Sequence, residues 1–530
     1  MAQSTRAVSR TKAKKTPKGA VSSRAVPRIT DVNQQMRNDE RRWWGFFFTM
    51  LFITLLAAGL ASVSVPKPLS LALVLLIATF VTAALRPVVG VYLLLFFTLV
   101  GDLVTTEWWP FTKNMSSQES ILYINDGLIL SPLEFLAGIT LAAFLLQRLA
   151  DPTWRFVRGR LFNPIALFTL FVIFGIGKGR ASGGDSRVAI FEFRSMLYIL
   201  VTYVLITNLI TTRRQYRRLV WVSVVAISIQ SVFSLQYYRT LPELERATLE
   251  SLGEHPSSVQ MDALFIFLLG LWLFKGRRWA RWTMLLLAVP VTYAYMLAQR
   301  RAAMVALFAG IIVLVVVLYH RRRKAFWFFT PTVAVLGIGF IGATWNASGG
   351  LGLASTAVKT VLFPGQLAES DAGSDMYRQI ETFDLWATIR ASPFTGLGFG
   401  QKFHAPIGLP DLSFFEFYEY IPHNSVLWIW VKMGVFGFVT MLYLMARAVQ
   451  LGIRSALNIR SEEQAVTVLV GLTYVIMFIV FAYVDIAWGS RSTVFLALAF
   501  ALCADMEPAM DETANVAEGV HHGQLESVVR

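Results

Sequence analysis

The chain has 530 residues, of which 55% are hydrophobic and only 15% are charged, and its formal net charge is +15 at pH 7. Soluble proteins carry about 25% charged residues, so this composition leaves too little charge for a water-exposed surface and excludes a soluble enzyme. Cys503 is the only cysteine, which excludes an intramolecular disulfide and a cysteine-based zinc cluster. The basic residues lie in short clusters between apolar runs, a pattern typical of membrane topology signals and not of a nucleic-acid-binding face.

The first 42 residues predict a disordered basic leader. They hold eleven Lys or Arg residues and three acids, with almost no large apolar side chains. No signal-peptide cleavage site precedes the first apolar stretch, so we expect that stretch to remain as a membrane anchor. At the other end of the chain, residues 508–530 predict a second disordered segment.

Apolar runs that are long enough to cross a bilayer follow the leader. A spanning helix needs about 17–25 residues. Fourteen segments meet or approach this length, at residues 43–64, 68–85, 87–104, 128–147, 162–177, 189–210, 219–237, 259–274, 282–299, 302–319, 325–345, 423–446, 464–486 and 491–507. The sequence therefore predicts an all-α polytopic integral membrane protein with about fourteen transmembrane helices, eleven within residues 43–345 and three within residues 423–507.

The distribution of basic residues predicts the orientation of these helices. With the leader in the cytoplasm, both termini lie inside, and 32 of the 48 Lys and Arg residues fall in inside loops. Removing one crossing would move the cluster from Arg321 to Lys324 to the outside, so the pattern favours an even number of crossings. Residues 346–422 then form one large outer, periplasmic loop with short helices, which is the predicted working surface.

One helix of the outer loop is predicted over residues 375–391, with Ser374 as its cap and Pro393 after its end. Its positions divide into two apolar faces, so we expect the helix to pack on both sides. Arg378 would lie in the first turn, where the helix dipole disfavours a cation, and a bound anion would relieve that conflict. The two predicted faces are Met376, Ile380, Phe383 and Ala387, and Arg378, Thr382, Leu385 and Ile389.

The outer loop and the helix after it carry motifs in a characteristic order. The order is Arg378, then Pro393 with Gly396, Gly398 and Gly400, then His423 and Asn424 entering a helix with Gly434 and Gly437. This order, over about residues 374–440, resembles the O-antigen ligase and polysaccharide polymerase superfamily, and the many-helix layout extends the resemblance across most of the chain. The segment QRRAAMVALFAG is similar to that family's Ser-Arg-Gly-Ala segment, with Arg301 at the arginine position. More loosely, ERATLESLGEHPSSVQMDAL is similar to the stretch with the family's other outer-face arginine, and Arg246 matches it.

The resemblance implies a glycosyltransferase of the bacterial inner membrane. Such an enzyme takes a glycan from an undecaprenyl-diphosphate carrier and passes it to an acceptor hydroxyl on the periplasmic face, without a metal ion or a cofactor. A diphosphate leaving group gathers negative charge, and the planar fork of an arginine offers two hydrogen bonds to phosphate. The expected diphosphate-binding residues are Arg301, Arg246 and Arg378, with Arg300 and Asn424 in support. His423 is the expected general base, because a neutral imidazole can take the proton of the acceptor hydroxyl.

The expected partners follow from the same resemblance. They are the undecaprenyl-diphosphate-linked glycan donor, a glycan or lipid acceptor, membrane lipids, and proteins of polysaccharide export or chain-length control, with no nucleic acid. Ligase and polymerase differ only in the acceptor, and the sequence leaves both open. A secondary transporter or a flippase of lipid-linked glycans is the alternative class, and it would place its ionisable residues near the membrane midplane.

Each candidate residue also has a structural interpretation that the sequence leaves open. His423 also fits a histidine that satisfies a helix start, and Arg301 fits a membrane-edge anchor, an interpretation that suits Arg300 better. Arg246 also fits a surface ion pair, and Arg378 a clamp across the loop.

Further polar residues and glycines favour structural roles. Glu192 and Arg194 are expected to pair with other helices, and Lys432 and Asp485 with each other or with lipid phosphate. The three glycines from Gly396 to Gly400 predict a tight turn through which the loop approaches the membrane domain closely. Gly434 and Gly437 predict close helix packing.

Overall fold

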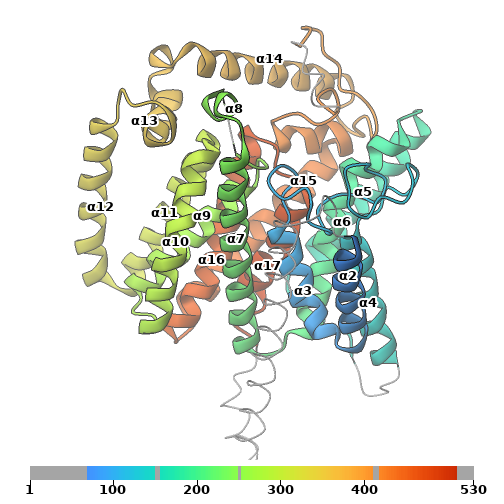
Figure 1. Ribbon diagram of the computed structural model, residues 1–530, viewed down its shortest axis with the longest axis horizontal. Coiled ribbons are helices and arrows are strands. Elements are labelled where there is room, and N and C mark those ends of the chain that lie inside the picture. Colours follow the sequence, from blue (N-terminus) through green and yellow to red (C-terminus); the bar gives the residue numbers. More distant parts are fainter. Residues whose placement is uncertain (1–68, 150–154, 249–251, 410–416, 510–530) are drawn as a thin grey trace, which may run out of the picture. The chain divides into compact units, whose positions relative to one another are not determined.

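A computed structural model describes residues 69–149, 155–248, 252–409 and 417–509 (Figure 1). In these ranges every regular element is a helix and no strand is present, which confirms the predicted all-α class for this part of the chain. The elements are α2 (Leu69–Leu85), α3 (Pro87–Val100), α4 (Pro132–Leu149), α5 (Phe162–Ala181), α6 (Ser186–Leu209), α7 (Arg213–Thr240), α8 (Glu243–Thr248), α9 (Ser257–Leu273), α10 (Arg278–Ala298), α11 (Arg301–Arg321), α12 (Arg323–Ala343), α13 (Gly349–Leu362), the 3-10 turn η1 (Pro364–Gln366), α14 (Glu369–Ala391), α15 (Ser425–Asn458), α16 (Glu462–Val484) and α17 (Ser490–Ala504). The expected leader (1–42), the first expected crossing (43–64) and residues 510–530 of the expected tail lie outside the described residues.

The expected crossings correspond to observed helices wherever the structure describes them. All thirteen expected segments from 68–85 to 491–507 fall on a helix. Nine helices of the described chain are long and apolar enough to cross a membrane, and four shorter apolar helices accompany them. This helix set is that of a polytopic membrane protein, and the total of fourteen crossings stays a prediction.

The helices differ greatly in how far they are enclosed. Helix α16 packs against α9, α11, α15 and α17, and 83% of its most apolar stretch is buried. Helix α12 lies at the other extreme, because none of its residues is buried. The core of the bundle therefore surrounds α16. Asp485 directly follows this enclosed helix, which holds its position.

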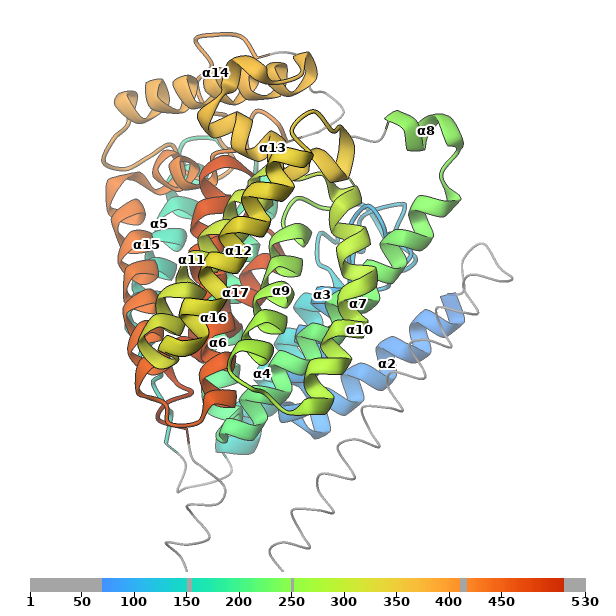
Figure 2. The ribbon, with the colours of Figure 1, turned by 90° about the vertical axis from the view of Figure 1, so that its left-hand side faces the viewer.

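Helices α13 and α14 lie across one end of the bundle, at the top of Figures 1 and 2. Two contacts tie the helix ends of the bundle to this region. Arg301 at the start of α11 contacts Asp375 of α14, and His423 before α15 contacts Glu381 of α14. The fold thereby brings segments from distant parts of the sequence to one end of the bundle.

Helix α14 differs from the prediction in its start and in its packing. It begins at Glu369, so Ser374 lies inside the helix, and the expected cap at Ser374 is wrong. The acidic Glu369 and Asp371 in the first turn favour this earlier start, because negative charge stabilises a helix N-terminus. Arg378 therefore lies well beyond the first turn, and the predicted conflict between its charge and the helix dipole does not arise.

Only one face of α14 is packed. Leu385 and Ile389 are buried, whereas Met376 and Phe383 of the other predicted face are 63% and 53% exposed. The expectation that the helix packs on both sides is therefore wrong within the described chain. Since α14 lies across the end of the bundle, only its lower face meets other helices (Figure 2).

Candidate active site

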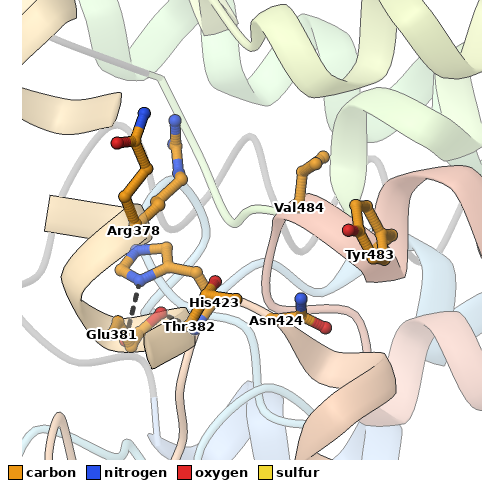
Figure 3. A pocket seen from close by; sticks show the side chains of 8 residues that line it. Arg378, Glu381, Thr382, His423, Asn424, Tyr483 and Val484 are labelled. Carbon is orange, nitrogen blue, oxygen red and sulfur yellow. Dashed lines mark hydrogen bonds and ion pairs between the residues drawn. The ribbon is translucent and has the colours of Figure 1, made fainter. Parts of the chain in front are cut away.

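A pocket of about 310 Å³ opens between α14, the start of α15 and the end of α16 (Figure 3). It contains three residues that the sequence singled out, namely Arg378, His423 and Asn424. The complete lining is Arg378, Gln379, Glu381, Thr382, His423, Asn424, Tyr483 and Val484. A cation, an imidazole and a carboxylate thus face one cavity.

Glu381 of α14 fixes the position of His423. One carboxylate oxygen of Glu381 accepts the backbone N–H of His423 at 2.8 Å, and the other lies 3.3 Å from the ring Nδ1 (Figure 3). The Glu381 side chain is buried, whereas the His423 side chain is 21% exposed. When Nδ1 donates to this carboxylate, Nε2 is left as the proton acceptor of the ring.

Glu381 is a site residue that the sequence did not predict, although a signal for it was present. Glu381 follows Arg378 by three residues on the predicted helix, and residues three apart share a helix face. Glu381 could have been identified as an acidic residue that shares a helix face with an arginine in the predicted working surface.

A second pair of histidine and carboxylate lies beside His423. Nδ1 of His255 lies 2.5 Å from Oδ1 of Asp485, and the Asp485 carboxylate is buried. The ring centroids of His255 and His423 are 6.1 Å apart, with 60° between the ring planes. Two imidazoles, each held by its own carboxylate, therefore stand next to each other.

The electrostatics of the second pair keep Asp485 charged and His255 neutral. Burial opposes the charged carboxylate, yet the hydrogen bond from His255 and the positive charge of Arg300 hold the pKa of Asp485 below its usual range. Burial lowers the pKa of His255, Arg300 and His423 act in the same direction, and Asp485 opposes them. The His255 ring is therefore a neutral imidazole near pH 7.

The predicted pairing of Lys432 with Asp485 or with lipid phosphate is wrong. Asp485 is engaged by His255, and Lys432 lies 2.6 Å from Glu192 of α6 in a fully buried ion pair. Residues 255 and 485 are 230 positions apart, so sequence spacing carried no signal for their contact.

Asp375 of α14 links two of the predicted arginines. Its oxygens accept hydrogen bonds from Nη1 and Nη2 of Arg301 at 3.1 and 3.0 Å, and Arg378 donates to the same carboxylate at 3.2 Å. Arg301 also donates to Oγ1 of Thr360, and Asp371 lies 3.7 Å from its Nε. Arg301 is thus joined to the pocket through Asp375, and the two guanidinium groups share this one carboxylate.

Arg300 and Asn424 support other parts of this region. Arg300 is the extended residue before α11, and its charge acts on both His255 and Asp485. The Asn424 side chain is buried and accepts the N–H of Leu427 at 3.0 Å, so it caps α15 directly after His423. Asn424 therefore holds the start of the helix that follows His423.

Arg246 has different surroundings. It lies in α8 and donates to the carbonyl oxygens of Arg239 and Leu241 at 2.7 Å each, next to the ring of Tyr238. No hydrogen bond or ion pair within the described ranges joins it to the pocket, and α8 and α15 lie on opposite sides of the bundle in Figure 2. The structure does not bring Arg246 together with Arg301, Arg378 and His423, and its predicted role in diphosphate binding stays a prediction.

The glycine turn before the pocket packs closely against two helices. Gly396, Gly398 and Gly400 all have positive φ, and a Cβ atom at Gly398 would lie 2.1 Å from the backbone nitrogen of Gly179. Glu192 accepts the N–H of Gly400 at 2.5 Å while it binds Lys432. The turn therefore has the close backbone approach that the sequence predicted, and the buried ion pair anchors it.

Gly434 has a different role from the helix packing predicted for it. Its φ of 69° breaks α15 at a kink, and an added Cβ atom would lie 2.0 Å from the carbonyl oxygen of Phe394. The kink lets Val435 donate to the carbonyl oxygen of Pro393 at 2.9 Å. Gly434 thus fits the glycine turn against the first part of α15, which begins at the pocket.

Comparison with known proteins identifies part of the chain. Residues 286–442 match the family model described as O-antigen ligase, which confirms the resemblance that the motifs indicated. No curated protein matches the chain. The matched segment contains Arg301, Arg378 and His423, whereas His255 and Asp485 lie outside it on either side.

Proposed function

We propose that this membrane protein, whose residues 286–442 belong to the O-antigen ligase family, transfers a glycan from an undecaprenyl-diphosphate carrier to an acceptor hydroxyl. One observation carries the proposal: His423, held by a buried carboxylate, shares a pocket with Arg378, and Asp375 connects that pocket to Arg301. A base and a pair of guanidinium groups are the side chains that this transfer needs.

His423 is the group that takes the proton. The acceptor oxygen forms a bond to the anomeric carbon, the bond from that carbon to the diphosphate oxygen breaks, and the hydroxyl proton passes to Nε2 of His423. Glu381 keeps Nδ1 protonated and stabilises the imidazolium that results. Asn424 holds the start of α15, so the histidine keeps its position during the reaction.

The two arginines bind the diphosphate and stabilise its charge as it leaves. A guanidinium that grips a carboxylate with two parallel hydrogen bonds offers the same fork to a phosphate group. Asp375 occupies that fork on Arg301 and also binds Arg378. The diphosphate would take the place of this carboxylate and lie between both arginines, next to His423.

The positions of these residues favour a transferase over a transporter. Arg301 opens α11, His423 precedes α15, and Asp485 follows α16, so these three groups lie at the ends of the bundle's helices. Secondary transporters place such residues near the midplane on interrupted helices. The kink at Gly434 lies about two and a half turns inside α15, and the polar contacts of the pocket lie before that helix begins.

Basic residues at the end of the bundle opposite the pocket support a cytoplasmic location for that end. Glu462 and Glu463 begin α16 there, and they bind Arg321, Arg217 and Arg277 at 3.1 to 3.3 Å. Basic clusters at one end of a set of spanning helices indicate the cytoplasmic side. The pocket at the other end would then face the periplasm of a bacterial inner membrane.

A transfer assay tests the proposal. Protein purified in detergent is mixed with the carrier-linked glycan extracted from host membranes and with a sugar acceptor, and we expect a glycan product. His423→Ala should lower the rate by about 10²- to 10⁴-fold. His404→Ala, at an exposed histidine of the same outer segment, serves as the control and should keep the rate. A wild-type protein that transfers no glycan would contradict the proposal.

The surface polysaccharide of a deletion strain separates the two acceptors that the family allows. Accumulation of single carrier-linked repeats with loss of all long chains indicates a polymerase. Accumulation of full-length polymer on the carrier indicates a ligase.

A further inference from the structure

We infer that His255, held by Asp485, is an acceptor-binding residue, and that His255 and His423 together grip two neighbouring hydroxyl groups of a sugar acceptor. This inference rests on the proposed glycan transfer and adds to it the chemical class of the acceptor, a polyol with adjacent hydroxyls. Neither His255 nor Asp485 lies in the segment that matches the family model, residues 286–442.

Both rings use the same atom to contact their carboxylate. Nδ1 of His255 contacts Asp485, and Nδ1 of His423 contacts Glu381. Each ring therefore has Nε2 left as a hydrogen-bond acceptor. The ring centroids are 6.1 Å apart, so two hydroxyl groups on adjacent sugar carbons can each donate one hydrogen bond of about 2.7–3.0 Å, one to each ring.

The rings are open to a ligand, while their carboxylates are not. The side chains of His255 and His423 are 31% and 21% exposed, whereas those of Asp485 and Glu381 are 1% and 2% exposed. Buried carboxylates fix the tautomer and the orientation of a ring whose far edge remains accessible. This is the arrangement expected of two binding groups and not of two packed core histidines.

The segment that carries His255 is rigidly held. The carboxylate of Asp102 accepts the N–H of Glu254 at 3.1 Å and the hydroxyl of Ser257 at 2.8 Å, on either side of His255. Arg491 donates to the same carboxylate at 2.8 Å from inside the bundle. His255 therefore sits on a short loop that is fixed at both ends to the core.

Asp485 is fixed to the segment that carries His423. The hydroxyl of Ser425, two residues after His423, donates to the carbonyl oxygen of Asp485 and accepts the N–H of Ala487, each at 3.0 Å. The two histidines are thus held at a set spacing by one network. A fixed spacing between two hydrogen-bond acceptors selects ligands whose donors have the matching spacing.

The charges around His255 keep it suited to accept a hydrogen bond. Arg300 before α11, Asp485 after α16 and His423 before α15 face the ring, and burial with Arg300 lowers its pKa. Nε2 of a neutral imidazole accepts a hydrogen bond from a hydroxyl group, whereas a charged imidazolium has no acceptor nitrogen. His423 takes the proton of the reacting hydroxyl, and His255 binds the neighbouring hydroxyl without changing its own protonation.

A comparison of two acceptors tests the inference. Wild-type protein and His255→Asn are assayed with the carrier-linked glycan as donor and an octyl glycoside as acceptor. The linkage in the wild-type product identifies which acceptor oxygen reacts. The second acceptor is then an octyl glycoside that lacks the hydroxyl on the carbon next to that oxygen. Asn can keep a hydrogen bond to Asp485, so the variant removes Nε2 with little disturbance of the loop.

We expect His255→Asn to raise the KM for the parent acceptor about tenfold, with the KM for the donor unchanged. For the acceptor that lacks the neighbouring hydroxyl, the two proteins should have the same KM, because the lost contact no longer exists. An equal rise of KM with both acceptors would overturn the inference and assign His255 a structural role. An unchanged KM for the parent acceptor would also overturn it.

The outcome is distinct from failure of the proposed function. Absence of transfer by the wild-type protein with both acceptors overturns the proposed function, whereas normal transfer by His255→Asn overturns only the role of His255. The melting temperature of the variant is compared with that of the wild type to identify an effect of misfolding. The second substitution, His255→Gln, serves the same purpose.

Discussion

The carboxylate of Asp375 binds the guanidinium of Arg301 with both of its oxygens, Oδ1 at 3.0 Å from Nη2 and Oδ2 at 3.1 Å from Nη1. Oδ1 also accepts a hydrogen bond from Arg378 at 3.2 Å. Any anion that uses the same fork of Arg301 must replace this carboxylate. The proposed diphosphate site therefore contains its own competitor.

Asp375→Asn should tighten the binding of inorganic pyrophosphate by about tenfold, because the substitution removes the charge that competes with the ligand. Calorimetric titration of detergent-purified protein measures the affinity without any transfer reaction. Asp371→Asn is the matched control, since the Asp371 carboxylate lies 3.7 Å from Nε of Arg301, and its effect should be smaller. Unchanged or weaker binding by the Asp375 variant would show that carboxylate and pyrophosphate do not compete.

Arg301→Lys should lower kcat/KM for the carrier-linked donor by about ten- to a hundredfold, because an ammonium group cannot form two parallel hydrogen bonds to one phosphate. Initial rates at varied donor concentration measure the effect. Arg390→Lys, at an exposed arginine in the last turn of α14, is the control and should behave like the wild type. Full activity of the Arg301 variant would support its interpretation as a membrane-edge anchor.

Glu192→Gln should destabilise the protein by about 3–5 kcal/mol, because it leaves the charge of Lys432 buried without its partner. Thermal unfolding in detergent measures the loss. The double variant Glu192→Gln, Lys432→Met removes both charges and should recover part of the stability. A double variant that is as unstable as the sum of its single variants would contradict the importance of the ion pair.

The pH dependence of stability should contain a contribution from Glu254. Burial and the charge of Asp102 raise the pKa of Glu254 from 4.5 to about 7. The folded state therefore keeps a proton that the unfolded state loses, so this residue's contribution to stability decreases as the pH rises from about 4.5 to about 7.

The substitution Glu254→Gln should remove this decrease. The variant should gain melting temperature over the wild type as the pH rises from 5 to 7, with a constant difference at higher pH. Glu243→Gln, at an exposed residue of α8, is the control and should follow the wild type throughout. A difference that stays the same at all pH values would argue against a raised pKa.

Much of the helical architecture could be predicted from the sequence, because spanning helices need long apolar runs and those runs are visible directly. All thirteen expected segments that the structure describes are helices. The predicted start of α14 is six residues too late, because Ser374 fits a capping pattern while Glu369 and Asp371 supply a competing start signal before it. The local sequence pattern predicted the presence of the helix, but the acidic residues of its first turn determine where it begins.

The site was accessible to sequence reasoning only in part. His423 and Arg378 were found through motifs, and the structure places them in one pocket. The partners of the charged residues were not found, because Lys432 and Glu192 are 240 positions apart and meet only through the packing of α6 against α15. Pairing across helices depends on tertiary structure, and residue spacing along one chain does not encode it.

Helix α12, which packs on one side against α11 and α13 but has no buried residue, sets a practical condition for handling the protein. In a bilayer, acyl chains coat the faces of this apolar helix that α11 and α13 leave open. After extraction, a surfactant must replace that coat along the full 21 residues. Micelle size and alkyl-chain length should therefore decide whether the purified material stays monodisperse or aggregates through this helix.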